Sequence, residues 1–229
     1  MQNINIQLYE VYRKFWNNLK DALQKINTVN LKISDPLLLY AFPEYEKAKV
    51  KLLIVGQQTC GWSDDSGDTL DADPIKKVME RYKNFHLGEK YKKSPFWYSS
   101  HDLYNKLNPD GPAYGFLWSN LIRVDQNCQR PKELIENVVC ESSPLLAYEI
   151  NLLKPDIVVF FTGPYYDNRL KKTFGKLTFE KVEGFRERVL SRIQHDGLPK
   201  YSFRTYHPNY LRLQRLLESV ISKIINEVL

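Results

Sequence analysis

The sequence has few cysteines, no long apolar run and no basic start followed by an apolar stretch. Its three cysteines, Cys60, Cys128 and Cys140, are odd in number and share no C-x-x-C spacing. This argues against a disulfide scaffold or a cysteine zinc site and favours a reducing compartment. No apolar stretch approaches the roughly 20 residues that span a bilayer, and no signal peptide is present. We therefore expect a cytoplasmic protein with no membrane partner.

What the sequence does contain is typical of a globular protein with a basic surface. Its 229 residues include 43% hydrophobic and 26% charged residues, which is enough for one sizeable core. The net charge of +6 favours a polyanionic partner. Aromatic residues make up 13% of the chain, and they either pack the core or offer stacking surfaces for bases. We expect one domain and a monomer.

Short apolar runs alternate with amphipathic segments along the chain. The patterns predict helices over residues 5–26, within 74–107 as two short helices, over 131–153 with a break at Pro144, and over 211–229. Asp35 followed by Pro36 predicts the start of another short helix. Predicted strands cover residues 51–56, 115–120, 157–161 and 201–206, and residues 176–190 are an edge strand or a hairpin.

This alternation predicts a three-layer α/β fold in which helices flank a four-stranded parallel sheet. Residues 48–229 would form the core, and residues 1–47 would form a helical extension packed on it. Ligands of such sheets lie just beyond the carboxyl ends of the strands. Four segments should therefore meet at one crevice, namely residues 57–62, 120–125, 162–165 and 207–212.

Three of these segments carry motifs in a telling order. Gly56-Gln-Gln-Thr-Cys-Gly-Trp62 follows the first strand, Asn120 ends Gly115-Phe-Leu-Trp-Ser-Asn, and His207-Pro-Asn-Tyr-Leu211 follows the last strand. They resemble the uracil-DNA glycosylase superfamily, whose best-known branch has Gly-Gln-Asp-Pro-Tyr-His, Gly-x-Leu-Leu-Leu-Asn and His-Pro-Ser-Pro-Leu-Ser at these places. The resemblance covers roughly residues 48–229 and implies that family's fold.

The resemblance implies a DNA-repair enzyme that flips a base out of DNA and hydrolyses its glycosidic bond without a metal or cofactor. In this interpretation His207 donates a hydrogen bond to the departing base. Asn120 recognises the edge of uracil through its carboxamide. Gln57 lines the base pocket.

The same resemblance assigns residues to DNA contact. Leu211 stands where the family has the apolar wedge that fills the gap left by a flipped base. Arg212 and Arg215 flank it and could hold phosphates. Trp62 is our candidate for the ring that stacks on the base, with Phe116 and Trp118 as alternatives.

Thr59 and Tyr210 replace prolines of the family pattern, and two further departures bear on the chemistry. Gln58 replaces the Asp of the best-known branch, and a neutral amide can position water but cannot act as a base. Asp64, Asp65 or Asp68 could supply the missing carboxylate, although nothing in the sequence selects one. Cys60 replaces a Tyr that blocks a methyl group at the 5-position of the base, so the smaller thiol would weaken rejection of thymine-like bases.

Other interpretations of these residues stay open. The aspartates of residues 64–73 could be solvated, with Asp73 capping a helix that starts at Pro74, or they could bind Mg²⁺. Cys60 could be a nucleophile beside His207. The chain could accordingly be a base-excision glycosylase, an inactive nucleic-acid-binding or nucleotide-binding member of the same fold, or a metal-dependent hydrolase of a nucleotide or phosphate ester.

Overall fold

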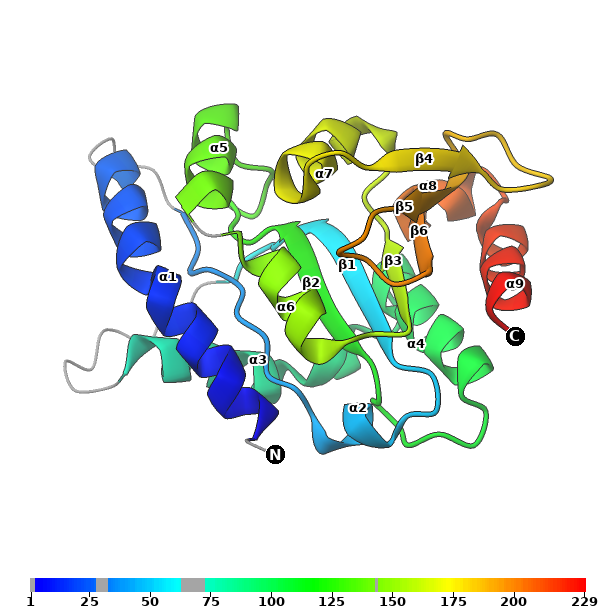
Figure 1. Cartoon of the computed structure of the whole chain (residues 1–229), viewed down its shortest axis with the longest axis horizontal. Helices are drawn as coiled ribbons and strands as arrows, with labels where there is room; N and C mark the ends of the chain where they lie inside the picture. Colours follow the sequence, from blue (N-terminus) through cyan, green and yellow to red (C-terminus); the bar gives the residue numbers. More distant parts are fainter. Residues whose placement is uncertain (1–2, 28–32, 63–72, 143) are drawn as a thin grey trace.

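A six-stranded mixed sheet forms the centre of the molecule, with strand order β2-β1-β3-β6-β5-β4 (Figure 1). The computed structural model describes residues 3–27, 33–62, 73–142 and 144–229. The strands are β1 (Leu52–Gln58), β2 (Leu117–Ile122), β3 (Ile157–Phe160), β4 (Thr178–Lys181), β5 (Leu190–Gln194) and β6 (Tyr201–Thr205). Strands β2, β1, β3 and β6 run parallel, as the sequence predicts.

The prediction of only four strands is wrong, because an antiparallel hairpin extends the sheet. Strand β4 pairs with β5, and β5 pairs with β6, both antiparallel. The hairpin alternative for residues 176–190 is therefore correct in kind, although its second strand begins at Leu190. Strand β4 lies at the sheet edge with three of its four residues exposed, which is why its apolar signal is weak.

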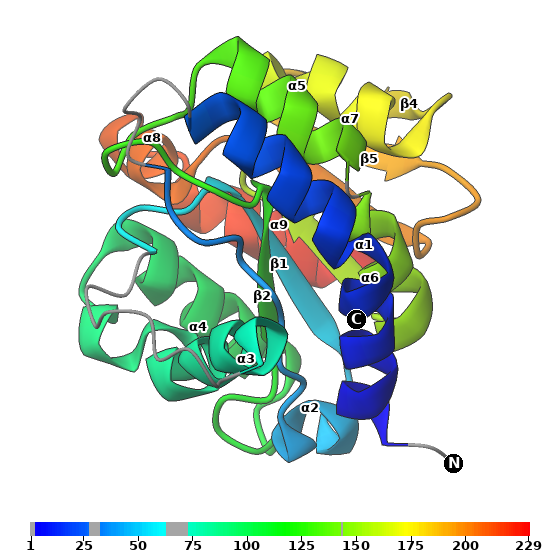
Figure 2. The same ribbon diagram turned by 90° about the vertical axis from the view of Figure 1, so that its left-hand side faces the viewer.

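Helices cover both faces of the sheet. Figure 2 shows α1 (Ile4–Asn27), α5 (Glu133–Ser142) and α6 (Leu145–Leu153) on one side of β1 and β2, and α3 (Pro74–Phe85) and α4 (Pro95–Leu107) on the other. Helix α4 also packs against α8 (Pro208–Leu213) and α9 (Leu217–Val228). The remaining elements are α2 (Pro43–Lys47), η1 (His86–Tyr91), η2 (Pro164–Tyr166) and α7 (Asp167–Phe174). No helix in the described ranges is long and apolar enough to cross a membrane.

Local signals for helix ends are confirmed at two places. The side chain of Asp73 accepts hydrogen bonds from the amides of Ile75 and Lys76, so it caps α3 as predicted. Helices α5 and α6 are separated at Pro144, as its ring requires.

Two other helix predictions are wrong. Asp35 and Pro36 start no helix, because the segment runs extended and the amide of Leu37 donates to the carbonyl of Arg123 at 2.8 Å. The final helix is not continuous: α8 ends at Leu213, and α9 begins only after Arg215 adopts a left-handed backbone with φ of 56°.

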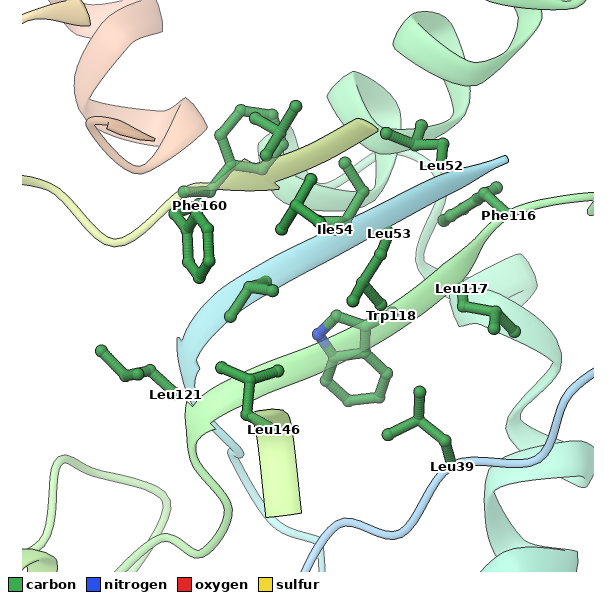
Figure 3. Packing of buried hydrophobic residues seen from close by; sticks show 14 of the residues in the cluster. Leu39, Leu52, Leu53, Ile54, Phe116, Leu117, Trp118, Leu121, Leu146 and Phe160 are labelled. Atoms are coloured by element: carbon green, nitrogen blue, oxygen red, sulfur yellow. The ribbon is translucent and has the colours of Figure 1, made fainter. Parts of the chain in front are cut away.

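The hydrophobic core lies on both sides of the parallel strands. Leu52, Leu53, Ile54 and Val55 of β1 are all 0% exposed, so the strand is buried on both faces. Figure 3 shows Leu39 and Leu146 in the same hydrophobic cluster as the residues of β1 and β2. The core therefore fixes β1 and β2 firmly, and the carboxyl ends of these strands become a rigid support.

A buried ion pair ties the N-terminal helix to this core. Arg123 donates to both oxygens of Glu149, at 2.9 and 2.5 Å, and the two side chains are 5% and 0% exposed. The hydroxyl of Tyr12, on α1, donates to Glu149 at 2.8 Å and accepts the amide of Leu39 at 2.9 Å. Helix α1 thus covers a charged pair that would be costly to leave half-satisfied.

We expect Glu149→Gln to lower the free energy of unfolding by about 3–5 kcal/mol, because it leaves the Arg123 charge buried and uncompensated. Urea denaturation measures the change. The matched control is Asp102→Asn, which removes a pair with Lys106 whose side chains are 22% and 42% exposed. That control should cost about 1 kcal/mol or less. Equal losses in the two variants would contradict the role given to the buried pair.

Candidate active site

A pocket of about 620 Å³ opens where β1 and β2 end, between the sheet and helices α3 and α4. Its size is ordinary for a small-molecule site. It is lined by Gly56, Gln57, Gln58, Thr59, Cys60, Gly61, Trp62, Arg81, Phe85, Tyr91, Ser94, Phe96, Trp97, Trp118, Asn120 and His207. The predicted residues Gln57, Gln58, Asn120 and His207 thus meet around one hollow.

The carboxamide of Asn120 is held in one orientation. Its Oδ1 accepts a hydrogen bond from Nε1 of Trp118 at 3.1 Å. An indole N–H can only donate, so the atom facing it must be the oxygen. Asn120 is 1% exposed, and its buried Nδ2 has no hydrogen-bond partner within the described part of the chain. Because Asn120 lines the pocket, this unused donor belongs to a residue of the pocket wall.

Gly56 makes room for this carboxamide. It pairs with Asn120 across β1 and β2, and a Cβ at position 56 would lie 2.3 Å from Oδ1 of Asn120. The same Cβ would lie 3.2 Å from the ring of Phe96. The glycine of the first motif is thus required by close packing of side chains in the pocket wall.

His207 lies at the amino end of α8 and faces the same pocket. Its Nδ1 accepts a hydrogen bond from the amide of Asn209 at 3.2 Å, so the ring proton of neutral His207 is on Nε2. Burial lowers the pKa of His207, which favours this neutral form. The ring is therefore a hydrogen-bond donor through Nε2 at neutral pH.

The two glutamines at the end of β1 are tied to the neighbouring strand ends. Nε2 of Gln57 donates to the carbonyl of Thr162 at 2.9 Å, and Oε1 of Gln58 accepts from the hydroxyl of Tyr166 at 3.0 Å. Burial raises the pKa of Tyr166, so this phenol remains a donor. Gln58 is consequently held by its oxygen, and its uncharged amide cannot take a proton from water.

No Asp or Glu lines the pocket in the described ranges. The candidates Asp64, Asp65 and Asp68, together with Asp71, lie outside the residues that the structure describes. Asp73 is used as a helix cap and also accepts the hydroxyl of Tyr9 at 2.7 Å. Among described residues, no group of three or more His, Cys, Asp or Glu side chains could hold a metal ion.

Aromatic rings form the walls of the pocket. Trp62 lines it but is only 6% exposed and packs edge-on against Trp118, with ring centroids 5.5 Å apart. Phe116 is wrong as a stacking candidate, because it is 0% exposed and does not line the pocket.

Phe96 lines the pocket and contacts His207, but the sequence did not reveal it as a site residue. Its ring is stacked on His207 at 5.7 Å and 21°, and it lies beside Gly56. Phe96 reaches the sheet from the first turn of α4, in the other layer of the fold. Ser94-Pro95 before it marks a helix start but gives no signal for the pocket, so only the tertiary structure reveals it.

Cys60 lies at the rim with its Sγ 3.0 Å from Sγ of Cys128. Both thiols are free and exposed. The hydrogen bond with Cys128 raises the pKa of Cys60 to about 11. The thiol therefore stays protonated at neutral pH, which disfavours the interpretation of Cys60 as a nucleophile.

The residues assigned to DNA contact differ in their exposure. Leu211 is 0% exposed, so its side chain does not reach the surface in this conformation, and its assignment as the wedge stays a prediction. It faces the core because α8 begins at Pro208 and turns this residue inward against the helical layer. Arg212 and Arg215 are exposed, and Arg212 donates to Oδ1 of Asn209 at 3.2 Å. Their contact with phosphates stays a prediction.

Together these groups suit a planar heterocycle. Asn120, with its unpartnered Nδ2 donor, and His207, with its Nε2 donor, both line one pocket with rings on its walls. Carbonyl oxygens on two edges of a flat ring would match both donors.

Comparison with known proteins agrees with this arrangement. The family model described as the Uracil DNA glycosylase superfamily matches residues 42–228, which include every pocket-lining residue. No curated protein matches the sequence. With a superfamily match over most of its length, a parallel sheet in the expected arrangement and the motif residues gathered at its carboxyl edge, the chain belongs to the uracil DNA glycosylase superfamily.

Proposed function

We propose that this protein hydrolyses the N-glycosidic bond that joins uracil, or a related base, to the sugar in DNA. The observation that carries the proposal is the unpartnered, buried Nδ2 of Asn120 on the same pocket as the neutral ring of His207. A buried donor without a partner is unfavourable unless a ligand supplies an acceptor. Superfamily membership supports a glycosylase-type reaction in general.

The pocket recognises the edge of the base by its pattern of donors and acceptors. Nδ2 of Asn120 would donate to O4 of uracil, and Oδ1 would accept N3–H with its remaining lone pair. Hypoxanthine offers the same pair of a carbonyl oxygen and a ring N–H. Cytosine and adenine present an amino group instead, so two donors would face one another. The orientation fixed by Trp118 therefore discriminates against cytosine and adenine.

The reaction breaks the bond between the sugar C1′ and the base nitrogen. The electron pair of that bond leaves with the base, whose O2 becomes anionic, and the sugar becomes cation-like. Nε2–H of His207 would donate to O2 and stabilise this charge. Water then adds to C1′ and releases a proton to solvent. His207 remains neutral throughout, as its lowered pKa favours.

Gln58 would contribute through position and not through charge. Its amide is anchored by Tyr166 at 3.0 Å and lies at the pocket, where it could orient the attacking water. It offers the sugar cation no negative charge. The proposal therefore assigns most of the rate acceleration to stabilisation of the departing base by Asn120 and His207.

The absence of a pocket carboxylate in the described residues favours one alternative, a member of the fold that binds a base without cleaving. Such a protein would retain the Asn120 donor and lose the chemistry at Gln58. Binding of uracil-containing DNA without release of uracil would identify it.

The proposal is tested with a labelled oligonucleotide that carries one uracil, followed by alkali to cleave abasic sites. We expect an abasic product from uracil and none from cytosine at the same position. Hypoxanthine and a mismatched thymine test the wider pocket left by Cys60. If enzyme in excess releases none of these bases or other damaged bases, the catalytic proposal fails.

Asn120→Asp is expected to reduce release of uracil by about 10²–10³-fold, the usual effect of removing one such donor. The aspartate keeps an acceptor for Trp118 and loses the donor that faces the base. Single-turnover rates give the comparison. Asn17→Asp, at an exposed position on α1, adds the same charge elsewhere and should leave the rate unchanged. Full activity of Asn120→Asp would show that this carboxamide does not recognise the base.

The dependence of kcat/KM on pH should report the state of His207. Protonation would place a hydrogen on Nδ1, where the amide of Asn209 now donates, so the charged ring loses its present orientation. Because burial lowers this pKa, activity should persist as the pH falls through about 6.5 and decline only below it. An acid limb centred above that value, or an unchanged limb in His207→Gln, would contradict this role.

A further inference from the structure

Three tyrosines lie on segments that follow the parallel strands, and one of them is next to a pocket residue in the sequence. Tyr165 lies in η2 after β3 and is 77% exposed, and Tyr210 lies in α8 after β6 and is 44% exposed. Tyr206 is half-buried and directly precedes His207, which lines the pocket. The proposed catalytic reaction uses none of the three.

Their contacts hold them as one surface. The rings of Tyr206 and Tyr210 lie 4.3 Å apart at an angle of 35°. The guanidinium of Arg188 lies 5.6 Å from the centre of the Tyr165 ring. Interactions with Tyr206, and also with Tyr165, raise the pKa of Arg188, so the arginine joins the two segments. We call Tyr165, Tyr206, Tyr210 and Arg188 the tyrosine surface.

Exposed arginines lie around the tyrosine surface and could contact phosphates. Arg186 and Arg188 are exposed in the turn between β4 and β5, and Arg212 is exposed on α8. The nearby carboxylate of Asp167 is paired with Arg204 at 3.0 Å. Glu183 and Glu187 are also exposed in this turn, so its two guanidinium groups are matched by two carboxylates, and Arg212 on α8 adds a further positive charge. Exposed aromatic rings with adjacent arginines are the usual means of holding unstacked bases.

We propose that the tyrosine surface stacks unpaired bases that neighbour the target nucleotide, and that single-stranded DNA is the preferred partner of this protein. The proposal rests on the proposed function, because it assumes that the target base occupies the pocket beside His207. Bases in a duplex cover each other's faces and cannot stack on these rings. Leu211, which would fill the gap in a duplex, is fully buried. A single strand needs no such filler.

Binding is measured first, apart from any excision. The probe is a fluorescein-labelled strand of deoxyadenosines about 16 nucleotides long, alone or annealed to its complement. Adenine is mismatched to the Asn120 donor, so the probe tests the surface and not the pocket. We expect fluorescence anisotropy to show at least about tenfold tighter binding of the single strand than of the duplex, or about 1.4 kcal/mol.

The variants are Tyr165→Ala and Tyr210→Ala, because these two rings are the most exposed and their loss should least disturb folding. Each should weaken single-strand binding by about five- to a hundredfold, the usual effect of removing one stacking ring. Duplex binding should change little. Tyr210→Trp should retain the affinity. The control is Tyr148→Ala on α6, where a ring of similar exposure, 40%, packs against Phe15.

The outcomes separate this inference from the proposed function. Unchanged single-strand affinity in both alanine variants, or an equal loss of duplex affinity, overturns the inference even if uracil is released. A loss confined to duplex binding for Tyr210→Ala would make that ring a duplex-inserting residue and would also overturn it. Tyrosine-dependent binding without release of uracil would overturn the proposed function alone.

Discussion

The hydrogen bond from the indole of Trp118 to Oδ1 of Asn120 is the constraint on which the pocket depends. This buried hydrogen bond joins two residues that are neighbours on the same face of β2. It fixes which atom of the carboxamide is the acceptor for the indole and which remains a free donor. Gly56 must then be glycine, because any side chain there would meet the oxygen that Trp118 holds. The indole N–H can only donate, so it binds the oxygen of the carboxamide. The positions of donor and acceptor that a base encounters follow from this one hydrogen bond.

The parallel strands could be predicted because a strand buried on both faces is a continuous apolar run in the sequence. The apolar run that becomes β1 is interrupted only where the strand leaves the core. Strand β4 has no such apolar run, since an edge strand exposes most of its side chains. The break between α8 and α9 has no sequence signal either, because Arg215 takes a left-handed backbone with neither a glycine nor a proline beside it.

The candidate site could be predicted where position along a strand decides function, and not where packing does. Asn120 lies on β2 near its carboxyl end and His207 follows β6, so the convergence of parallel strands brings them together. Phe96 comes from a helix in another layer, and no spacing in the sequence connects it with either. The burial of Leu211 could not be predicted either: its place in the motif suggests exposure, whereas the side chain is fully buried on the short helix α8.

The cover provided by α1 has a consequence for where the folding unit begins. The superfamily match starts at residue 42, yet Leu8, Tyr12 and Leu19 are part of the same core and Tyr12 completes the shell of Glu149. A boundary drawn by family likeness would therefore cut through the hydrophobic interior and open a buried charge to water. Helix α1 carries none of the motifs, yet it shields the core and the buried ion pair of the motif-bearing domain from water.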